Sequence, residues 1–126
     1  MQIKQMISYL SCRLAISDVK TRELLERGLI GRVKQEFKDD VTIAGMATAG
    51  IPWAHSIAQK LELPMLYVRS SEKAYGLKGL IEGNLKYASK KAIIVDDVLY
   101  TGDTVKKAQE VLKQNGIETV GVACIA

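Results

Sequence analysis

Residues 92–104 read AIIVDDVLYTGDT, and they combine three features in one short stretch. An apolar run typical of a buried strand is followed directly by two acids, Asp96 and Asp97. The chain then turns through Gly102 into a helix that we expect to begin near Asp103. Ligands bind at the carboxyl ends of the strands in open α/β sheets. The order of strand, acids, glycine and helix therefore predicts a ligand site at this strand end.

The rest of the chain alternates between short apolar runs and helical stripes. The runs are nearly continuous, as in strands of a parallel sheet that are buried on both faces, and they lie at residues 42–45, 64–68, 92–95 and 120–125. Between them, apolar residues recur at helical spacing at residues 25–37, 51–61 and 105–112. This alternation predicts an α/β fold with a mostly parallel sheet flanked by helices.

Residues with capping preferences mark the ends of the expected helices. Asp18 is the expected N-cap of the first helix. Pro52 fits the first turn of the second helix, where its missing N–H costs nothing, and Asn115-Gly116 ends the third. Because no linker or internal repeat is visible, we expect one domain over residues 1–126.

The composition of the 126 residues fits one globular domain, with 48% hydrophobic and 25% charged residues. No apolar run approaches the roughly 18 residues that span a bilayer, and we expect no signal peptide. The net charge is +4 without any block of five basic residues, so neither a membrane nor a nucleic acid is an expected partner. Cys12 and Cys124 lack metal-ligand spacing, and Cys124 is expected to be a buried thiol of a cytoplasmic protein.

Residues 69–83 (RSSEKAYGLKGLIEG) fit neither pattern, because they are polar and carry three glycines between two expected strands. Connections of this length without secondary structure are uncommon in compact domains and often act as lids. The segment is therefore predicted to be a mobile loop, with a plain surface hairpin as the alternative.

The acid pair suits a sugar. Adjacent acids on a chain point in different directions, so Asp96 and Asp97 are poorly placed to share one proton. They are better suited to accept hydrogen bonds from two neighbouring hydroxyls, as on a ribose.

The turn after the acids suits a phosphate. The first N–H groups of a helix have no internal partners and lie at its positive end, where a phosphate monoester fits. Thr101 and Thr104 would add their hydroxyls, and Gly102 allows the backbone to approach closely. Asp103 would repel the phosphate, so we expect it to face solvent or cap the helix.

Residues 45–50 (GMATAG) have the Gly-x4-Gly spacing of a Walker A loop, but Ile51-Pro52 stand where that motif needs Lys and Ser or Thr. Small residues between a strand and a helix can still hold a second phosphate. In the helix that follows, Trp53 is expected to pack or form an interface. His55 is the only histidine of the chain and has no Cys nearby, so it is expected at the surface.

These motifs are similar to those of type I phosphoribosyltransferases, which bind phosphoribosyl pyrophosphate (PRPP). Residues 94–104 resemble the PRPP signature of that family. Within the family, residues 45–52, 67–76 and 81–83 resemble orotate phosphoribosyltransferase. The resemblance runs from about Cys12 to the C-terminus and rests on three motifs in the right order.

The resemblance implies a role for each matching position. Asp96 and Asp97 would bind the ribose hydroxyls. The other PRPP-binding residues would be Val98, Tyr100, Thr101, Gly102, Asp103 and Thr104, the last four around the 5-phosphate. The pyrophosphate loop would consist of Met46, Ala47, Thr48, Ala49 and Gly50. Arg69 and Lys73 would neutralise the pyrophosphate, and Lys73, Tyr75 and Asp97 would be the catalytic residues.

The implied reaction is the transfer of ribose 5-phosphate from PRPP to a pyrimidine base, with orotate as the expected base and pyrophosphate as the second product. Mg²⁺ would arrive chelated by PRPP rather than in a protein site. The family's mobile loop reaches the site of the neighbouring subunit, so a homodimer is implied.

The sequence also departs from the family pattern. The family's N-terminal hood and its C-terminal segment, which both contact the base, are expected to be missing before Cys12 and after Ala126. Ala74 stands where the family usually has an acid, and Asp103 is unusual in the phosphate loop.

A second resemblance leaves an alternative function open. Residues 96–102 also look like the pyrimidine-operon attenuation regulator, an RNA-binding protein on the same fold. The alternative is therefore a non-catalytic regulator that binds PRPP or a nucleotide. The motif at residues 73–83 favours the orotate enzyme.

Overall fold

The computed structural model describes residues 13–37, 40–69, 80–99 and 101–125. Most of the predicted mobile loop, including Lys73 and Tyr75, lies outside the described residues, and so does Tyr100.

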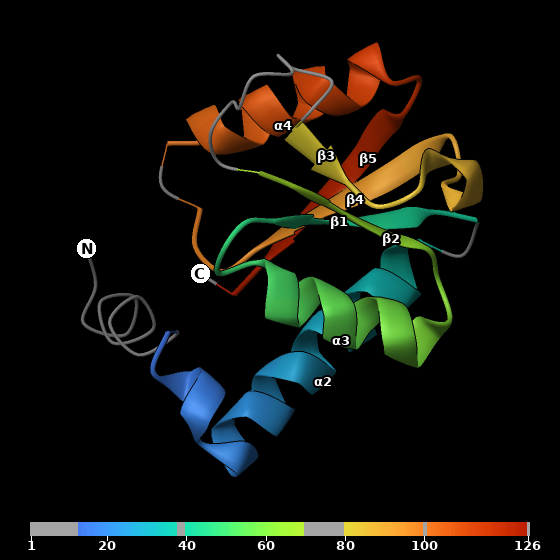
Figure 1. Ribbon diagram of the computed structural model, residues 1–126. Coiled ribbons are helices and arrows are strands. Elements are labelled where there is room, and N and C mark those ends of the chain that lie inside the picture. Colours follow the sequence, from blue (N-terminus) through green and yellow to red (C-terminus); the bar gives the residue numbers. More distant parts are fainter. Residues whose placement is uncertain (1–12, 38–39, 70–79, 100, 126) are drawn as a thin grey trace.

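A five-stranded sheet forms the centre of the molecule (Figure 1). Its strands are β1 (Thr42–Met46), β2 (Met65–Val68), β3 (Ile81–Glu82), β4 (Lys91–Asp96) and β5 (Glu118–Cys124). Their order across the sheet is β3-β2-β1-β4-β5, and all neighbours are parallel except β2 and β3. The predicted mostly parallel sheet is therefore confirmed.

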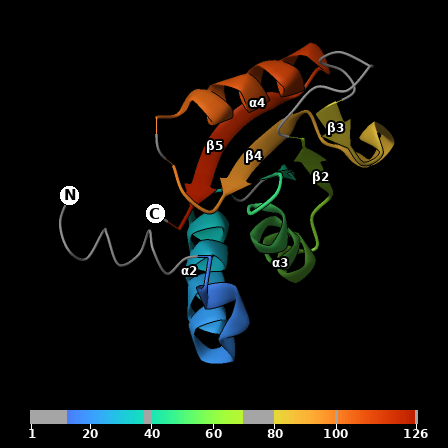
Figure 2. The same cartoon turned by 60° about the vertical axis from the view of Figure 1, so that its left-hand side comes forward.

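Helices cover both faces of this sheet. They are α2 (Val19–Glu36), α3 (Ile51–Leu61) and α4 (Asp103–Gln114), with short 3-10 turns η1 (Ala15–Ser17) and η3 (Leu85–Tyr87). Helices α2 and α3 lie against one face and α4 against the other (Figures 1 and 2). The connections β1–α3–β2 and β4–α4–β5 supply the helical crossovers that parallel strands need.

Two apolar clusters fill the layers on either side of the sheet. Alternate side chains of a strand point to opposite faces. On β4, Ile93 and Val95 therefore pack with α2 and α3, whereas Ala92 and Ile94 pack with α4. Because both faces of β4 are buried, its sequence is a continuous apolar run rather than an alternating one.

Strand β5 differs from the prediction of a strand buried on both faces. Most of its residues are half-buried, and Val122 is exposed. Within the described residues β5 is the last strand of the sheet, so a neighbouring strand covers only one of its edges. Cys124 is accordingly half-buried, whereas the sequence predicted a buried thiol.

The expected helix ends are confirmed. Asp18 caps α2, because its carboxylate accepts a hydrogen bond from the Thr21 N–H at 3.0 Å. Pro52 lies in the first turn of α3. Gly116, with φ of 79°, follows the end of α4.

Three further expectations can be compared with the structure. Trp53 is buried, and His55 is exposed, both as predicted. The end of the predicted loop instead contains β3, whose two residues pair with β2 as an antiparallel edge. A strand of two residues is too short for its sequence to show a period.

Of the helices in the described ranges, none is both long and apolar enough to cross a membrane.

Candidate functional site

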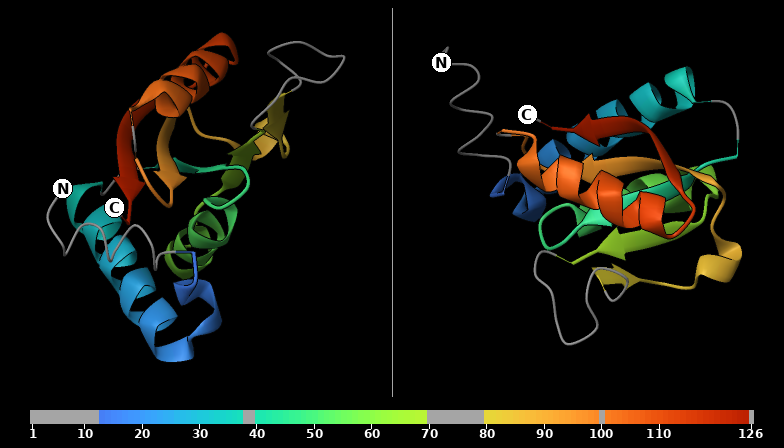
Figure 3. Two further views of the ribbon diagram at one scale, coloured as in Figure 1. Left: turned by 90° about the vertical axis from the view of Figure 1, so that its left-hand side faces the viewer. Right: turned by 90° about the horizontal axis from the view of Figure 1, so that it is seen from above.

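The residues that the sequence singles out come together at one edge of the sheet. Strands β2, β1 and β4 are parallel neighbours, so their carboxyl ends lie side by side. Arg69 follows β2, residues 47–50 follow β1, and Asp96 and Asp97 stand at the end of β4. The view from above in Figure 3 shows the loop before α3 and the start of α4 at this same edge. The topology therefore brings these residues together at one edge of the sheet.

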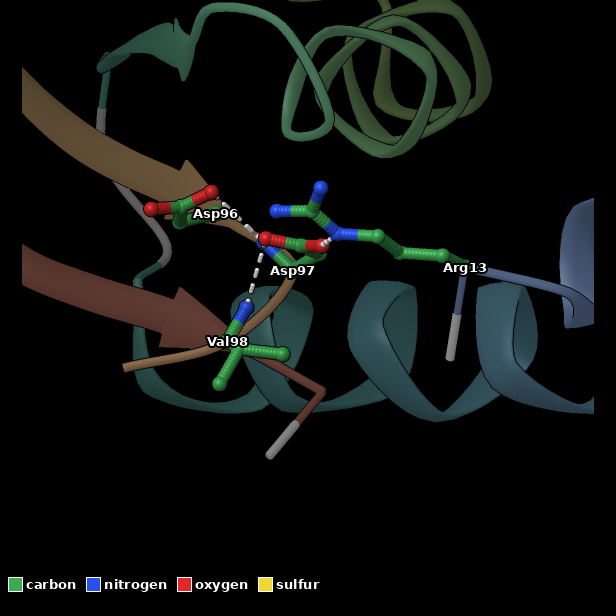
Figure 4. Close-up of polar contacts among 4 residues, drawn as sticks. All are labelled: Arg13, Asp96, Asp97 and Val98. Carbon is green, nitrogen blue, oxygen red and sulfur yellow. Dashed lines mark hydrogen bonds and ion pairs between the residues drawn. The ribbon is translucent and has the colours of Figure 1, made fainter. Parts of the chain in front are cut away.

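Asp96 and Asp97 have different surroundings. Asp97 is 3% exposed, whereas Asp96 is half-buried. Asp96 Oδ1 accepts a hydrogen bond from the Asp97 N–H at 2.8 Å, and Asp97 Oδ1 accepts one from the Val98 N–H at 2.8 Å (Figure 4). The two carboxylates thus have different hydrogen-bond partners. The Val98 N–H is used inside the protein, so a ligand would meet only the side chain or carbonyl of Val98.

The pKa of Asp96 is raised from its ordinary value of 3.8 to about 6. Burial is the largest cause, and the adjacent Asp97 carboxylate adds to it. The hydrogen bond from the Asp97 N–H and the positive charge of Arg13 act in the opposite direction. The negative charge of Asp96 is therefore costly to the folded protein. Acids with perturbed pKa values cluster at functional sites, so Asp96 is a candidate.

Arg13 is a site residue that the sequence reasoning missed. Its Nε donates a hydrogen bond to Asp97 Oδ2 at 3.1 Å, across 84 positions of sequence. The two residues share no local motif, so only an alignment of relatives or a structure could have revealed the pair.

The loop at residues 47–50 offers backbone groups. The N–H groups of Ala47, Gly50 and Ile51 donate to the carbonyls of Val68, Met46 and Thr48. Within the described residues, the N–H groups of Thr48 and Ala49 have no backbone carbonyl partner. The peptide bond between Ala47 and Thr48 is cis. The loop can therefore donate hydrogen bonds to an anion through its middle residues.

Met46 and Gly50, the first and last residues of the predicted pyrophosphate loop, have surroundings that differ from those of the residues between them. Met46 is the last residue of β1, and its side chain is buried in the apolar cluster under α4. Its side chain therefore cannot face a ligand. Gly50 is packed so tightly that a Cβ atom there would lie 2.5 Å from the Val95 carbonyl oxygen. The loop is thus pressed directly against the end of β4.

The predicted phosphate turn precedes α4. Gly102 has φ of 83°, a conformation that glycine adopts without strain, and it is the N-cap of α4. Thr101 Oγ1 accepts a hydrogen bond from the Asp103 N–H at 3.3 Å. Thr101, Asp103 and Thr104 are exposed, so Asp103 faces solvent as predicted.

Arg69 is held at the end of β2 by two contacts. Its N–H donates to the Leu80 carbonyl at 2.7 Å, and its Nη1 lies 2.9 Å from Glu82 Oε1. Glu82 belongs to the Ile81-Glu82-Gly83 motif, and nothing in that motif predicts its ion pair with Arg69. The ion pair fixes a cation beside the loop at residues 47–50, because the Ala47 N–H bonds to Val68, the residue before Arg69.

Two hollows on the surface of the described residues lie away from the acid pair. One of about 470 Å³ lies between α2 and β5, and another of about 560 Å³ lies between α3 and the β2–β3 pair. Neither Asp96 nor Asp97 lines either hollow. The site is therefore located by the strand ends and not by the volume of a cavity.

Residues 15–126 match the model of the phosphoribosyl transferase domain family. The chain belongs to this family. The matched residues include the acid pair, the loop at residues 47–50 and the turn before α4. The fold and the predicted type I phosphoribosyltransferase family are thereby confirmed.

Individual relatives of this phosphoribosyltransferase domain are similar over most of its length. Orotate phosphoribosyltransferase of Staphylococcus aureus (strain Mu50) is 43% identical over 117 residues, which are 93% of this chain and 57% of that protein. The crystal structure of orotate phosphoribosyltransferase from Aeropyrum pernix superposes with a TM-score of 0.72 at 29% identity, covering 85% of this chain and 59% of that one. The chain thus spans less than two thirds of these proteins.

A third comparison separates the fold from the choice of base. Adenine phosphoribosyltransferase from Rhodothermus marinus superposes with a TM-score of 0.68 at 20% identity, covering 87% of this chain and 69% of that one. At this identity the likeness shows the fold alone. Members named for different bases therefore share this architecture.

Proposed function

We propose that the chain transfers a ribose 5-phosphate group from PRPP to a pyrimidine base, with orotate as the base and pyrophosphate as the second product. The proposal rests on one observation, the order of chemical groups along the sheet edge where β2, β1 and β4 end. Arg69 and the loop at residues 47–50 lie at the ends of β2 and β1, the acid pair at the end of the next strand, β4, and the turn at residues 101–104 follows it.

This order matches the order of groups in PRPP. The diphosphate is attached to C1 of the ribose, the two hydroxyls stand on C2 and C3, and the phosphate is on C5. A cation and free loop N–H groups suit the diphosphate. Carboxylates suit the two hydroxyls, and a helix N-terminus preceded by a glycine suits the 5-phosphate.

The reaction breaks the bond between C1 and the diphosphate oxygen and forms a bond between C1 and a base nitrogen. Negative charge grows on the leaving diphosphate, so fixed cations stabilise the transition state more than the bound substrate. Arg69 would supply one such charge, held in place by Glu82. Lys73 and Tyr75 would act from the segment at residues 70–79, and these roles remain predictions.

Mg²⁺ would accompany PRPP and offset the charge of its diphosphate. The carboxylate of Asp96 is the kind of hard oxygen ligand that this ion prefers. Within the described ranges, however, no three His, Cys, Asp or Glu side chains gather to hold a metal. The ion would therefore depend on the phosphate oxygens of the ligand.

The choice of orotate rests on similarity and not on the fold. The Staphylococcus aureus and Aeropyrum pernix proteins are both named orotate phosphoribosyltransferase. The motifs at residues 45–52 and 81–83, which led to the orotate resemblance, lie within the described residues. A homodimer and a cytoplasmic location belong to the same proposal.

Pyrophosphate release from PRPP and Mg²⁺ tests the activity, with orotate, uracil, adenine and hypoxanthine offered separately. We expect release with orotate and formation of the corresponding nucleoside monophosphate. Lys73→Ala should lower the turnover and leave the circular dichroism spectrum unchanged. Arg27→Met serves as the matched control, because it removes a cation from an exposed ion pair with Glu23 on α2.

Two results would contradict the proposal. PRPP binding by calorimetry without turnover of any base would leave a binding protein rather than an enzyme. Binding of uridine-rich RNA with a steep salt dependence would then support the regulatory alternative.

A further inference from the structure

Arg13 reaches the acid pair from outside the sheet. It stands just before η1, and its side chain is 70% exposed, whereas the side chain of Asp97 is 4% exposed. Figure 4 shows the guanidinium over the Asp97 carboxylate, with one terminal nitrogen extending toward Asp96. An exposed cation is thus joined to a buried carboxylate at the end of β4.

The contact completes the hydrogen bonding of a buried charge. Asp97 Oδ1 accepts the Val98 N–H, and Asp97 Oδ2 accepts the Arg13 Nε–H. A buried carboxylate is tolerated only when it is paired and hydrogen-bonded. Each of its oxygens is therefore tied to a different donor, and the two bonds together fix the rotation of the carboxylate about its χ2 angle.

We propose that Arg13 is a positioning residue of the ribose site, which holds the Asp97 carboxylate in one orientation for the hydroxyls of a ribose 5-phosphate. This inference rests on the proposed function, because it assigns the ligand of the same acid pair.

Binding of ribose 5-phosphate, measured by calorimetry, gives a direct test without the need for a base. Arg13→Met should weaken binding about tenfold, as expected for a buried carboxylate that loses its charged donor. Arg13→Lys keeps the charge but not the Nε–H donor, and an intermediate affinity is expected. Arg27→Met removes the same charge from the exposed Glu23 pair of α2 and should bind like the wild type.

A double-mutant cycle separates action through Asp97 from direct contact with the ligand. Arg13→Met is compared in the wild-type background and in Asp97→Asn. If Arg13 acts through Asp97, its loss costs about tenfold in the first background and less than twofold in the second. Asp97→Asn also removes the buried charge, so the double variant is expected to fold even if Arg13→Met alone does not. Arg13→Lys then carries the comparison in the wild-type background.

The pH dependence of binding gives a readout that a purely structural role would not move. Among the described residues, the charged and titratable groups that act on Asp96 or pair with it are Asp97, which directly follows β4, Arg13 from before η1 and Cys124 on β5. Arg13 lowers the pKa of Asp96, so Arg13→Met should move the pH midpoint of binding upward. Arg13→Lys keeps the positive charge and should leave the midpoint near its wild-type position.

The outcomes distinguish the two proposals. Wild-type binding with an equal loss from Arg13→Met in both backgrounds, or with no loss at all, would overturn the positioning role and leave the proposed function intact. Tighter binding by Arg13→Met would also overturn it, because Arg13 would then compete with the ligand. No binding of ribose 5-phosphate or PRPP by the wild type would overturn the proposed function and this inference with it.

Discussion

Gly50 gives a sharp test of how the site is assembled. Its backbone has φ of −78° and ψ of −18°, which alanine adopts freely, so any effect of Gly50→Ala must come from space and not from backbone conformation. The added Cβ would lie 2.5 Å from the Val95 oxygen, 2.7 Å from the Met46 oxygen and 3.0 Å from the Asp96 Cα. All three are backbone atoms at the ends of central strands.

These backbone neighbours determine how much the Gly50→Ala substitution lowers the unfolding free energy. A flexible side chain could rotate away, but β1 and β4 are held by hydrogen bonds on both edges. The loop before α3 must therefore move off the end of β4. Overpacking of this kind costs about 1–3 kcal/mol of unfolding free energy. For a domain of this length the melting temperature should fall by about 4–12 °C.

Urea unfolding and thermal unfolding of Gly50→Ala measure the loss, with Gly31→Ala as the control. Gly31 lies inside α2 with nothing within 4 Å of its added Cβ, so the same chemical change should stabilise the protein by about 0.5–1 kcal/mol. The two substitutions should therefore have opposite signs. An unfolding midpoint of Gly50→Ala equal to that of the wild type would refute the close packing of the loop on β4. Calorimetry with pyrophosphate should also show weaker binding to Gly50→Ala than to Gly31→Ala.

Three further predictions follow from the charges of the site. Asp96→Asn should raise the unfolding free energy at pH 7.5 by about 1 kcal/mol in urea titrations, after discounting the shift because the side chain is only half-buried. The pKa of Asp96 rises from 3.8 to about 6 on folding, so its ionisation lowers stability between about pH 4 and 6 and the gain should disappear near pH 4. The pKa of the Cys124 thiol is raised by burial and by the charge of Asp96. In a Cys12→Ser background, thiol alkylation at pH 7.5 should therefore be slow and should accelerate in Asp96→Asn, and an unchanged rate would contradict the electrostatic coupling. Arg69→Gln should change the unfolding free energy by less than about 1 kcal/mol, because the ion pair is partly exposed, and should weaken pyrophosphate binding several-fold in calorimetry.

The sequence was sufficient for the fold because most of its elements have distinctive patterns. Strand β4 is buried on both faces and reads as a continuous apolar run, while α3 and α4 have regular apolar stripes bounded by Pro52 and Gly116. The errors lie at the edges of the sheet. Strand β5 is as apolar as a central strand but has one strand neighbour in the described residues, and β3 is too short to show a period. The apolar content of a strand predicts how much of its surface could be buried. The position of the strand in the sheet determines how much of that surface is actually covered.

The location of the site was predictable for a similar reason. In a parallel sheet the residues after neighbouring strands must meet at one edge. The sequence was therefore enough to predict that the acid pair lies near Arg69 and the loop at residues 47–50. The surroundings of each residue were not predictable in this way. The ion pair of Arg69 with Glu82 depends on an antiparallel edge strand of two residues. No pattern in the sequence predicted that strand.

The chemical state of the acid pair shows where a motif stops being informative. The sequence of residues 92–104 predicts two carboxylates after a buried strand, but it does not predict which carboxylate is buried or which cation pairs with it. In the folded chain Asp97 is the buried acid, and its second oxygen is bonded to Arg13, which lies 84 positions earlier. Among the described residues, the same motif without that arginine would retain only the Val98 N–H as a hydrogen-bond donor to the buried carboxylate. The hydrogen bonding of Asp97 is therefore set by a contact between distant segments and not by the motif that carries both acids. The same arginine lowers the pKa of Asp96, against the burial that raises it.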